Sequence, residues 1–108
     1  MTPENNLNVL LCNTGSLKNA EILATVLVKA KLIACANIIH NVSSIYEWKG
    51  KIEQRSQYTI IMKTFSKNFN KLEELILKHH EDEVPEIIAL SSNYVYDKYL
   101  NWAEDYCG

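Results

Sequence analysis

The sequence contains no apolar run long enough to form a membrane-spanning helix, which requires about 20 residues. Met1 to Asn6 carry neither the basic nor the apolar segment of a signal peptide. Only three glycines and two prolines occur among the 108 residues, and there is no low-complexity stretch, linker or repeat. We therefore expect one domain over residues 1-108 with no membrane partner, since an apolar content of 47% suffices for one core.

A basic surface is also missing. The chain has 11 Lys and Arg against 13 Asp and Glu, a formal net charge of -2, whereas nucleic-acid binding depends on many cations that neutralise phosphates. An RNA-recognition domain would also display aromatic residues on its central strands, and the strand expected first, Leu7 to Cys12, has none. We therefore expect no nucleic-acid partner.

Cysteine is scarce and odd in number. Cys12, Cys35 and Cys107 are widely separated, which disfavours a disulfide framework and favours reduced thiols in a cytoplasmic protein.

Catalytic motifs are absent as well. No nucleophile stands beside a base in a recognisable pattern, and there is no Gly-rich phosphate loop. An acylphosphatase-like activity would need an Arg in the loop Asn13 to Ser16, but the single Arg of the chain is Arg55. We expect that the protein is not an enzyme.

The first half of the chain predicts a strand, a helix and a long strand. Leu7 to Cys12 is a short apolar run. Ser16 is placed to cap an amphipathic helix over Leu17 to Lys31. Ile33 to Ile39 and Val42 to Trp48 are typical of one strand with an interruption.

The second half predicts a hairpin partner, a helix, a strand and a helix. Lys49-Gly50 forms a turn before a strand over Lys51 to Thr64. Ser66 is expected to cap the second helix, Glu86 to Leu90 to form a last core strand, and Tyr94 to Tyr106 to form the final helix. The order indicates an α+β, ferredoxin-like split βαβ sandwich, an antiparallel sheet with helices on one face and an additional C-terminal helix.

The hairpin is too long for the rest of the domain. Fully extended, Lys51 to Thr64 would measure on the order of 45 Å, whereas a typical strand has about 5 to 6 residues. Part of the hairpin must project, with strand edges and apolar side chains exposed. We expect these side chains to contact other subunits; they are Ile45, Tyr46, Trp48 and Ile52.

Five segments together resemble the CutA family of divalent-cation tolerance proteins. Ser44 to Glu53 is similar to its Tyr-x-Trp-x-Gly-Lys hairpin. The other four resemble its L-A-A-C-x-N-I run, a strand end, its V-P-E-I segment and its closing Y-L-x-W; they are Leu32 to Ile39, Ile61 to Thr64, Val84 to Leu90 and Tyr99 to Trp102. The resemblance implies a ferredoxin-like protomer that assembles as a homotrimer through its long hairpins.

The resemblance also implies a metal site. Some bacterial members bind copper through a Cys at the end of the first strand and a His-His pair after the second helix, positions that match Cys12, His79 and His80. Copper is therefore the predicted metal, zinc or another divalent cation is the alternative, and no organic cofactor is expected. From the residues alone, Cys12 also fits a buried strand, and the histidines fit a solvated helix end.

Two functions follow from the resemblance. In the first, a trimer binds divalent metal ions, chiefly copper, and contributes to the response to metal ions. In the second, the trimer resembles PII-type signalling or scaffold proteins and binds a small ligand or an unidentified protein partner in its intersubunit clefts. Lys63 and Glu86 are the residues predicted to face such a cleft. The family commonly has His-Pro-Tyr before its V-P-E segment, whereas here Glu81 and Asp82 follow His80. This difference removes an aromatic residue that could stack on a ligand in the cleft and adds two carboxylates beside the histidines.

Overall fold

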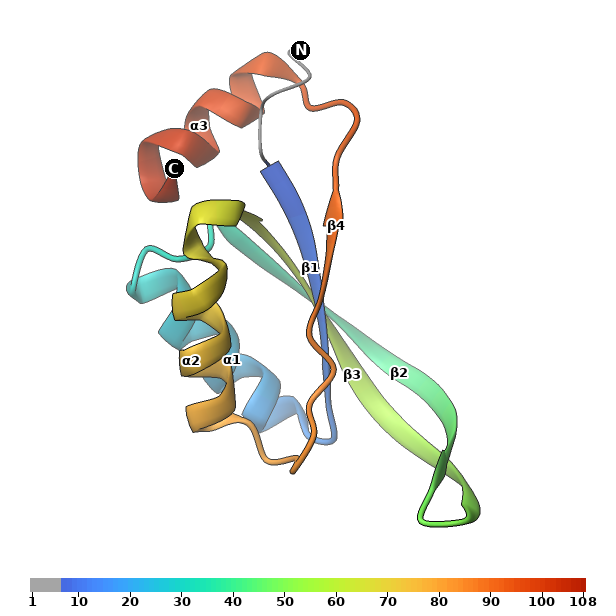
Figure 1. The fold of residues 1–108 in the computed structure, drawn as a ribbon. Helices are drawn as coiled ribbons and strands as arrows, with labels where there is room; N and C mark the ends of the chain where they lie inside the picture. Colours follow the sequence, from blue (N-terminus) through green and yellow to red (C-terminus); the bar gives the residue numbers. More distant parts are fainter. Residues whose placement is uncertain (1–6) are drawn as a thin grey trace.

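The computed structural model describes residues 7–108. Its elements are β1 (Leu7–Thr14), α1 (Leu17–Lys29), β2 (Cys35–Trp48), β3 (Lys51–Phe65), the 3-10 helix η1 (Ser66–Asn68), α2 (Phe69–His79), β4 (Ile88–Ser91) and α3 (Asp97–Cys107). Within these residues the strands form a four-stranded antiparallel sheet in the order β2-β3-β1-β4. This topology confirms the predicted ferredoxin-like α+β fold (Figure 1).

Helices α1 and α2 cover one face of the sheet (Figure 1). Along β1, side chains alternate between the buried face and the other face, because successive residues of a strand point to opposite sides. The core between sheet and helices consists of Leu10, Cys12, Ala20, Leu23, Leu27, Leu32, Ile33, Ile60, Met62, Leu72 and Ile76. None of the helices in residues 7–108 has both the length and the apolar content that crossing a membrane requires.

Helix α3 covers a second, smaller core at the other end of the sheet. This core consists of Leu7, Ala34, Phe65, Val95, Leu100, Ala103 and Cys107. The hydroxyl of Tyr106 donates a hydrogen bond of 2.6 Å to the carbonyl oxygen of Val28 at the end of α1. The C-terminal helix therefore closes the apolar end of the protomer.

Helix α1 begins where the sequence predicts. Ser16 is its N-cap, and the Ser16 hydroxyl accepts a hydrogen bond of 3.1 Å from the backbone N–H of Asn19. The predicted apolar stripe is buried against the sheet, with Ala20, Leu23 and Leu27 among the covered residues. The start of α1 is thereby fixed directly after β1.

The β2-β3 hairpin has the predicted turn and projection. Lys49 and Gly50 have φ angles of 51° and 82°, positive values that a two-residue type I′ turn requires. The predicted interruption of β2 lies at Asn41, with φ of 60°, where the register shifts between Ile39 and Val42. The hairpin leaves the body of the protomer (Figure 1), whose longest dimension is 45 Å against 26 and 23 Å for the others.

The prediction that Ser66 caps the second helix is wrong. Ser66 begins η1, and α2 starts at Phe69 with Asn68 as N-cap and no side-chain capping bond. The Asn68 amide instead donates to the carbonyl oxygens of Leu32 (3.3 Å) and Cys107 (2.8 Å). These partners are distant in the sequence, so tertiary packing overrides the local capping signal.

The last strand and the last helix also differ from the prediction. Strand β4 begins at Ile88 rather than Glu86, and all four of its residues are exposed, so it is not a core strand. The reason is its place at the sheet edge, where β1 is its one neighbour among the described strands. Helix α3 begins at Asp97 rather than Tyr94.

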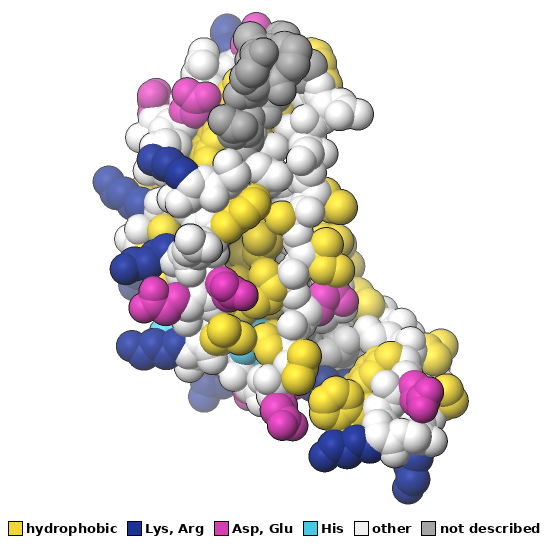
Figure 2. Space-filling model, viewed as in Figure 1, with side chains coloured by type: hydrophobic (Ala, Val, Ile, Leu, Met, Phe, Trp, Pro, Cys, Tyr) yellow, Lys and Arg dark blue, Asp and Glu magenta, His cyan; other side chains and the backbone are white. Residues whose placement is uncertain are grey.

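The sheet face opposite α1 and α2 is apolar and only partly covered. Val9 and Leu11 of β1 pair with Leu90 and Ile88 of β4, and directly paired residues share a face. Ile88 and Leu90 are exposed. Figure 2 shows hydrophobic side chains gathered along the middle of the molecule and again on the projecting hairpin. An isolated protomer therefore leaves much apolar surface in water.

Candidate functional site

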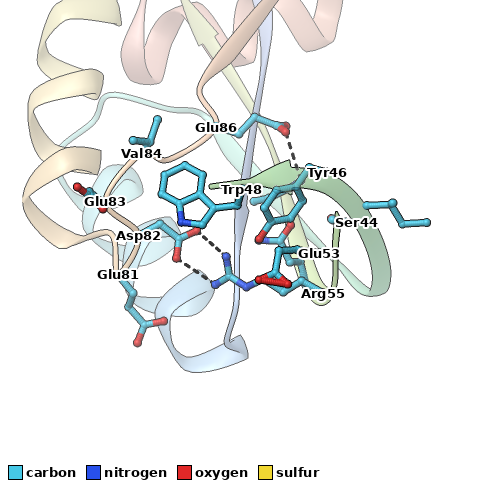
Figure 3. A pocket seen from close by; sticks show the side chains of 13 residues that line it. Ser44, Tyr46, Trp48, Glu53, Arg55, Glu81, Asp82, Glu83, Val84 and Glu86 are labelled. Carbon is cyan, nitrogen blue, oxygen red and sulfur yellow. Dashed lines mark hydrogen bonds and ion pairs between the residues drawn. The ribbon is translucent and has the colours of Figure 1, made fainter. Parts of the chain in front are cut away.

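A cavity of about 620 Å³ lies between the projecting hairpin and the loop that precedes β4. Figure 3 shows Tyr46 and Trp48 reaching from the hairpin toward the loop, which carries Asp82 and Val84. The lining residues are Asn13, Ser44, Ile45, Tyr46, Trp48, Glu53, Arg55, Gln57, Glu81, Asp82, Glu83, Val84 and Glu86. A volume of this size suits a small organic ligand, because such sites measure about 300 to 1,000 Å³.

An ion pair closes one side of the cavity. Arg55 Nη1 and Nη2 each lie 3.0 Å from one carboxylate oxygen of Asp82, a two-point contact between hairpin and loop (Figure 3). A Cβ at position 15 would overlap Arg55 Nη2, so Gly15 leaves the room that the guanidinium occupies. The hydrogen bonds from Arg55 are the main reason that the pKa of Asp82 lies below its ordinary value.

We predict that Arg55→Gln raises the pKa of Asp82 toward its ordinary value. In the unfolded chain Asp82 binds protons more readily, so the ion pair stabilises the fold above about pH 4 and this contribution is lost as the pH falls through the lower, folded pKa. Both side chains are partly exposed, so the contribution stays below about 1 kcal/mol. Carboxyl ¹³C NMR titration checks the shift, and an unchanged Asp82 pKa in the variant would contradict the assignment.

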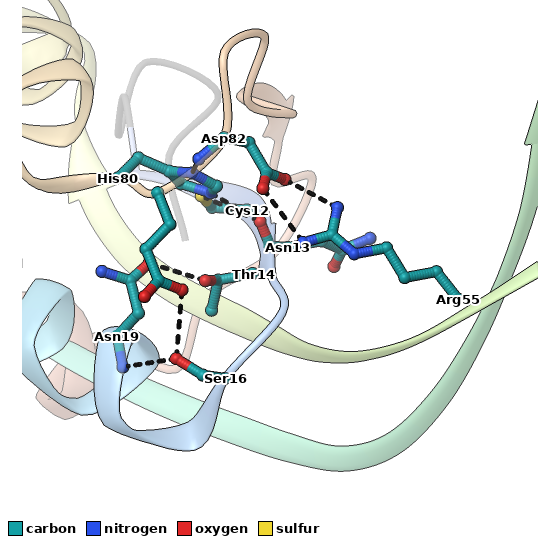
Figure 4. A network of polar contacts seen from close by, with 9 residues as sticks. Cys12, Asn13, Thr14, Ser16, Asn19, Arg55, His80 and Asp82 are labelled. Atoms are coloured by element: carbon teal, nitrogen blue, oxygen red, sulfur yellow. Dashed lines mark hydrogen bonds and ion pairs between the residues drawn. The ribbon is translucent and has the colours of Figure 1, made fainter. Parts of the chain in front are cut away.

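His80 ties the loop to the end of β1 (Figure 4). Its Nδ1 accepts a hydrogen bond of 2.9 Å from the backbone N–H of Asp82. The other ring nitrogen, Nε2, lies 2.7 Å from the carbonyl oxygen of Asn13 and must donate to it, since a carbonyl only accepts. Both ring nitrogens of His80 are therefore engaged in positioning the loop.

A second set of hydrogen bonds holds the neighbouring element ends (Figure 4). The buried Thr14 hydroxyl donates to Asn19 Oδ1 at 2.6 Å. The Asn19 amide donates to the carbonyl oxygen of His79 at 2.9 Å, and the Ser16 hydroxyl donates to Glu81 at 3.1 Å. One hydrogen-bond network behind the cavity therefore connects the end of β1, the end of α2 and the start of α1; we call it the polar joint.

Cys12 lies in the core beneath this joint and has no exposed surface. Burial, followed by the carboxylates of Glu86 and Asp82, raises the pKa of the Cys12 thiol to about 12. Without a bound metal the Cys12 thiol is therefore protonated at neutral pH, and a metal ion that binds it would have to displace this proton.

The three predicted metal ligands lie at the same end of the protomer but do not form a ligand set. His80 contacts the residue after Cys12, whereas His79 is a partly exposed residue at the end of α2. Within residues 7–108, no group of three or more His, Cys, Asp or Glu side chains is close enough together to hold a metal ion. The donor set therefore does not fit a metal in this arrangement of the protomer.

We predict that Cys12 resists alkylation while the protein is folded. With the thiol buried and its pKa raised to about 12, its reaction with iodoacetamide at pH 8 should be at least about 100-fold slower than in guanidinium chloride, since only the thiolate reacts. Mass spectrometry of the peptides that contain Cys12 measures both rates. Equal rates in the folded and unfolded chain would show that the end of β1 opens readily.

The two residues predicted to face a cleft are not brought together. Glu86 lines the cavity and accepts a hydrogen bond of 3.4 Å from the Asn13 amide. Lys63 is not among the lining residues and instead contacts the side chains of Asn37 and Cys35 on the uncovered sheet face. The Lys63 ammonium is therefore directed to a different surface.

Sequence reasoning missed the residues that shape the cavity, above all Arg55, Asp82 and Gln57. Their signal was weak: one Arg inside the hairpin, and carboxylates after His80. Ile45, Tyr46 and Trp48, predicted as subunit contacts, line the cavity, whereas Ile52 is 74% exposed and lies outside it.

The comparisons with known proteins agree with the fold. A family model described as CutA1 divalent ion tolerance protein matches residues 8–106. Protein CutA, chloroplastic, of Arabidopsis thaliana is 41% identical over 83 residues, which cover 77% of this chain and 46% of that protein. The chain thus spans about half the length of curated relatives such as this one.

Bacterial relatives match over nearly their whole length. Divalent-cation tolerance protein CutA of Thermus thermophilus is 34% identical over 100 residues, which cover 93% of this chain and 97% of that protein. The solved structure of the Cut A1 protein from T. thermophilus has a TM-score of 0.91 at 33% identity and covers 94% of this chain and 99% of that one.

Proposed function

This chain belongs to the CutA1 divalent ion tolerance protein family, and on that premise we propose that it forms a homotrimer that binds divalent metal ions, chiefly copper. In this role it contributes to tolerance of divalent cations. The observation that carries the proposal is the family match over residues 8–106.

The uncovered apolar surface supports the assembly. Ile45 and Ile52 on the hairpin are 68% and 74% exposed, and the open sheet face adds Ile88 and Leu90. Stable monomers rarely expose apolar patches of this extent, whereas subunit interfaces bury them. Among the described strands, β2 and β4 lie at the two edges of the sheet, and the backbone groups on the outer side of an edge strand can pair with a neighbouring copy.

The three proposed metal ligands, Cys12, His79 and His80, differ in how accessible they are to a metal ion. Among the three, His79 is the residue that is partly exposed and has no side-chain hydrogen bond to the described residues, so its ring can bind an ion without a change of the loop. Binding through His80 or Cys12 would have to replace the hydrogen bonds to Asn13 and Asp82 or expose a buried thiol. Metal affinity should therefore depend first on His79.

Calorimetric titration of Cu²⁺ and Zn²⁺ tests the proposal. The intact protein should bind Cu²⁺, and His79→Ala should weaken this binding at least about tenfold, the usual scale for removal of a group at a metal site. His40→Ala is the matched control, because His40 lies on β2 and its ring packs edge-on against Tyr58 at 5.2 Å. No heat from the intact protein would reject metal binding. Unchanged heat from a Cys12→Ser, His79→Ala, His80→Ala variant would reject the ligands.

The cavity favours a second candidate function. Its volume of about 620 Å³ and its mixture of aromatic and charged walls are those of a small-ligand site. We propose, as this second function, that the trimer acts as a PII-like signalling or scaffold module and binds a small molecule or a protein partner there.

A further inference from the structure

The cavity is strongly anionic. The negative charge of Asp82 is neutralised by Arg55. Four other carboxylates line the cavity and have no salt bridge among the described residues; they are Glu53, Glu81, Glu83 and Glu86. The Ser16 hydroxyl and the Asn13 amide bind two of them, but neither group carries a charge. A cation is therefore the ligand charge that this lining attracts.

The negative charge is spread around the cavity and does not converge on one point. Among residues 7–108 no three acidic, His or Cys side chains are close enough to coordinate one ion. Separated carboxylates do not provide the several converging oxygen ligands that Ca²⁺ or Mg²⁺ requires. They suit a larger cation, whose charge can lie near any one of them.

The walls favour an organic body on that cation. Tyr46 and Trp48 from β2 line the cavity together with Val84 from the loop (Figure 3). Aromatic rings attract ammonium groups through their faces and pack against planar or apolar groups. The hairpin therefore supplies the apolar contacts, and the carboxylates supply the charge.

Gln57 supplies a polar group at the cavity wall. The residue is only 6% exposed and lines the cavity. No buried side-chain nitrogen or oxygen of the described residues lacks a hydrogen-bond partner, so the Gln57 amide, for which these residues provide none, is open to the cavity and not sealed from solvent. A polar group of a bound molecule can hydrogen-bond this amide.

We propose that the cavity binds a small organic cation: an amine with a planar apolar body and a polar group that hydrogen-bonds Gln57. The ammonium lies among the glutamates, and the body packs on Tyr46 and Trp48. This inference names the ligand class for the second function proposed above and rests on that function. It does not depend on metal binding.

The test uses tyramine, which carries an ammonium, an aromatic ring and a hydroxyl. Tyramine should bind the intact protein in low salt and shift the indole N–H signal of Trp48 in ¹⁵N NMR spectra. Trp102 on α3 is 51% exposed and outside the cavity, so its signal is the internal control. The matched anion 3-(4-hydroxyphenyl)propanoate should bind at least about tenfold more weakly, because its carboxylate meets like charges.

Two variants locate the binding. Glu83→Gln should weaken tyramine binding about threefold to tenfold, whereas Glu73→Gln on the exposed side of α2 should not change it. Phenethylamine, which lacks the hydroxyl, should bind more weakly than tyramine, and Gln57→Met should remove that difference. Thermal melts verify that each variant remains folded.

The outcomes separate the two levels of the proposal. Binding of the propanoate in preference to tyramine would overturn the cation class and leave the cavity as a ligand site. If neither probe moves the Trp48 signal, both the ligand class and the small-ligand form of the second function fail. Tyramine binding that is equally strong in Glu83→Gln and Glu73→Gln would overturn the assignment to this cavity.

Discussion

Leu23→Ala is expected to lower the free energy of unfolding by about 3 kcal/mol, within the range that buried Leu→Ala changes give. Leu23 is 1% exposed and lies on α1 in the core between the sheet and the two helices. The truncation removes apolar contacts and leaves a cavity that close-packed neighbours cannot fill. Because small proteins are stable by only about 5 to 15 kcal/mol, this one change removes a large share of the stability.

Urea denaturation at one fixed protein concentration measures the effect, since assembly makes apparent stability depend on concentration. Leu77→Ala is the matched control, because Leu77 is 54% exposed on α2 and the same atoms are removed. Its loss should stay below about 1 kcal/mol. Equal losses in the two variants would show that the helices do not pack on the sheet as described.

A shortened hairpin is expected to convert the proposed trimer to monomers. Ser43 and Ser56 are directly paired, so residues 44–55 can be replaced by Asn-Gly, which closes such a pair with a type I′ turn. The replacement removes four apolar side chains; they are Ile45, Tyr46, Trp48 and Ile52. Without this surface the interface should fall below the about 1,000 Å² that a stable assembly needs.

Light scattering measures the result. The intact protein should show a mass near three times its chain mass of 12.4 kDa, and the shortened chain should show the mass of one chain. Arg55→Ala in the full-length hairpin is the control for the arginine that the replacement also removes, and it should remain a trimer. A shortened chain that still scatters as three copies, or an intact chain that scatters as one, would reject assembly through the hairpin.

The resemblance located the end of the protomer where the site lies, but not the chemistry of the side chains there. By the resemblance alone, Cys12 and His80 match the positions expected for metal ligands in some members of the family. In the fold, Cys12 is buried with its thiol protonated, and His80 uses both ring nitrogens to hold the loop. Residue type at a motif position therefore indicates proximity, whereas protonation and hydrogen bonding follow from the packing around it.

The two predicted helix caps likewise separate what residue type predicts from what packing decides. Ser16 was predicted correctly as a cap because its hydroxyl binds an N–H three residues away. Ser66 has the same residue type before a helical pattern, yet it begins η1, and α2 starts only after Asn68. The Asn68 amide donates to the carbonyl oxygens of Leu32 and Cys107, so the segment before α2 is held by residues that are distant in the sequence.

The sequence by itself determined the order of the elements, the turn at Lys49 and Gly50 and the projecting hairpin, because periodicity and turn residues act between near neighbours. Only the tertiary structure decided that Arg55 meets Asp82 and that β4 lies exposed at an edge. Arg55 and Asp82 are 27 residues apart, and such contacts form only when the whole chain packs. The cavity and its charge therefore belong to the fold rather than to any one motif.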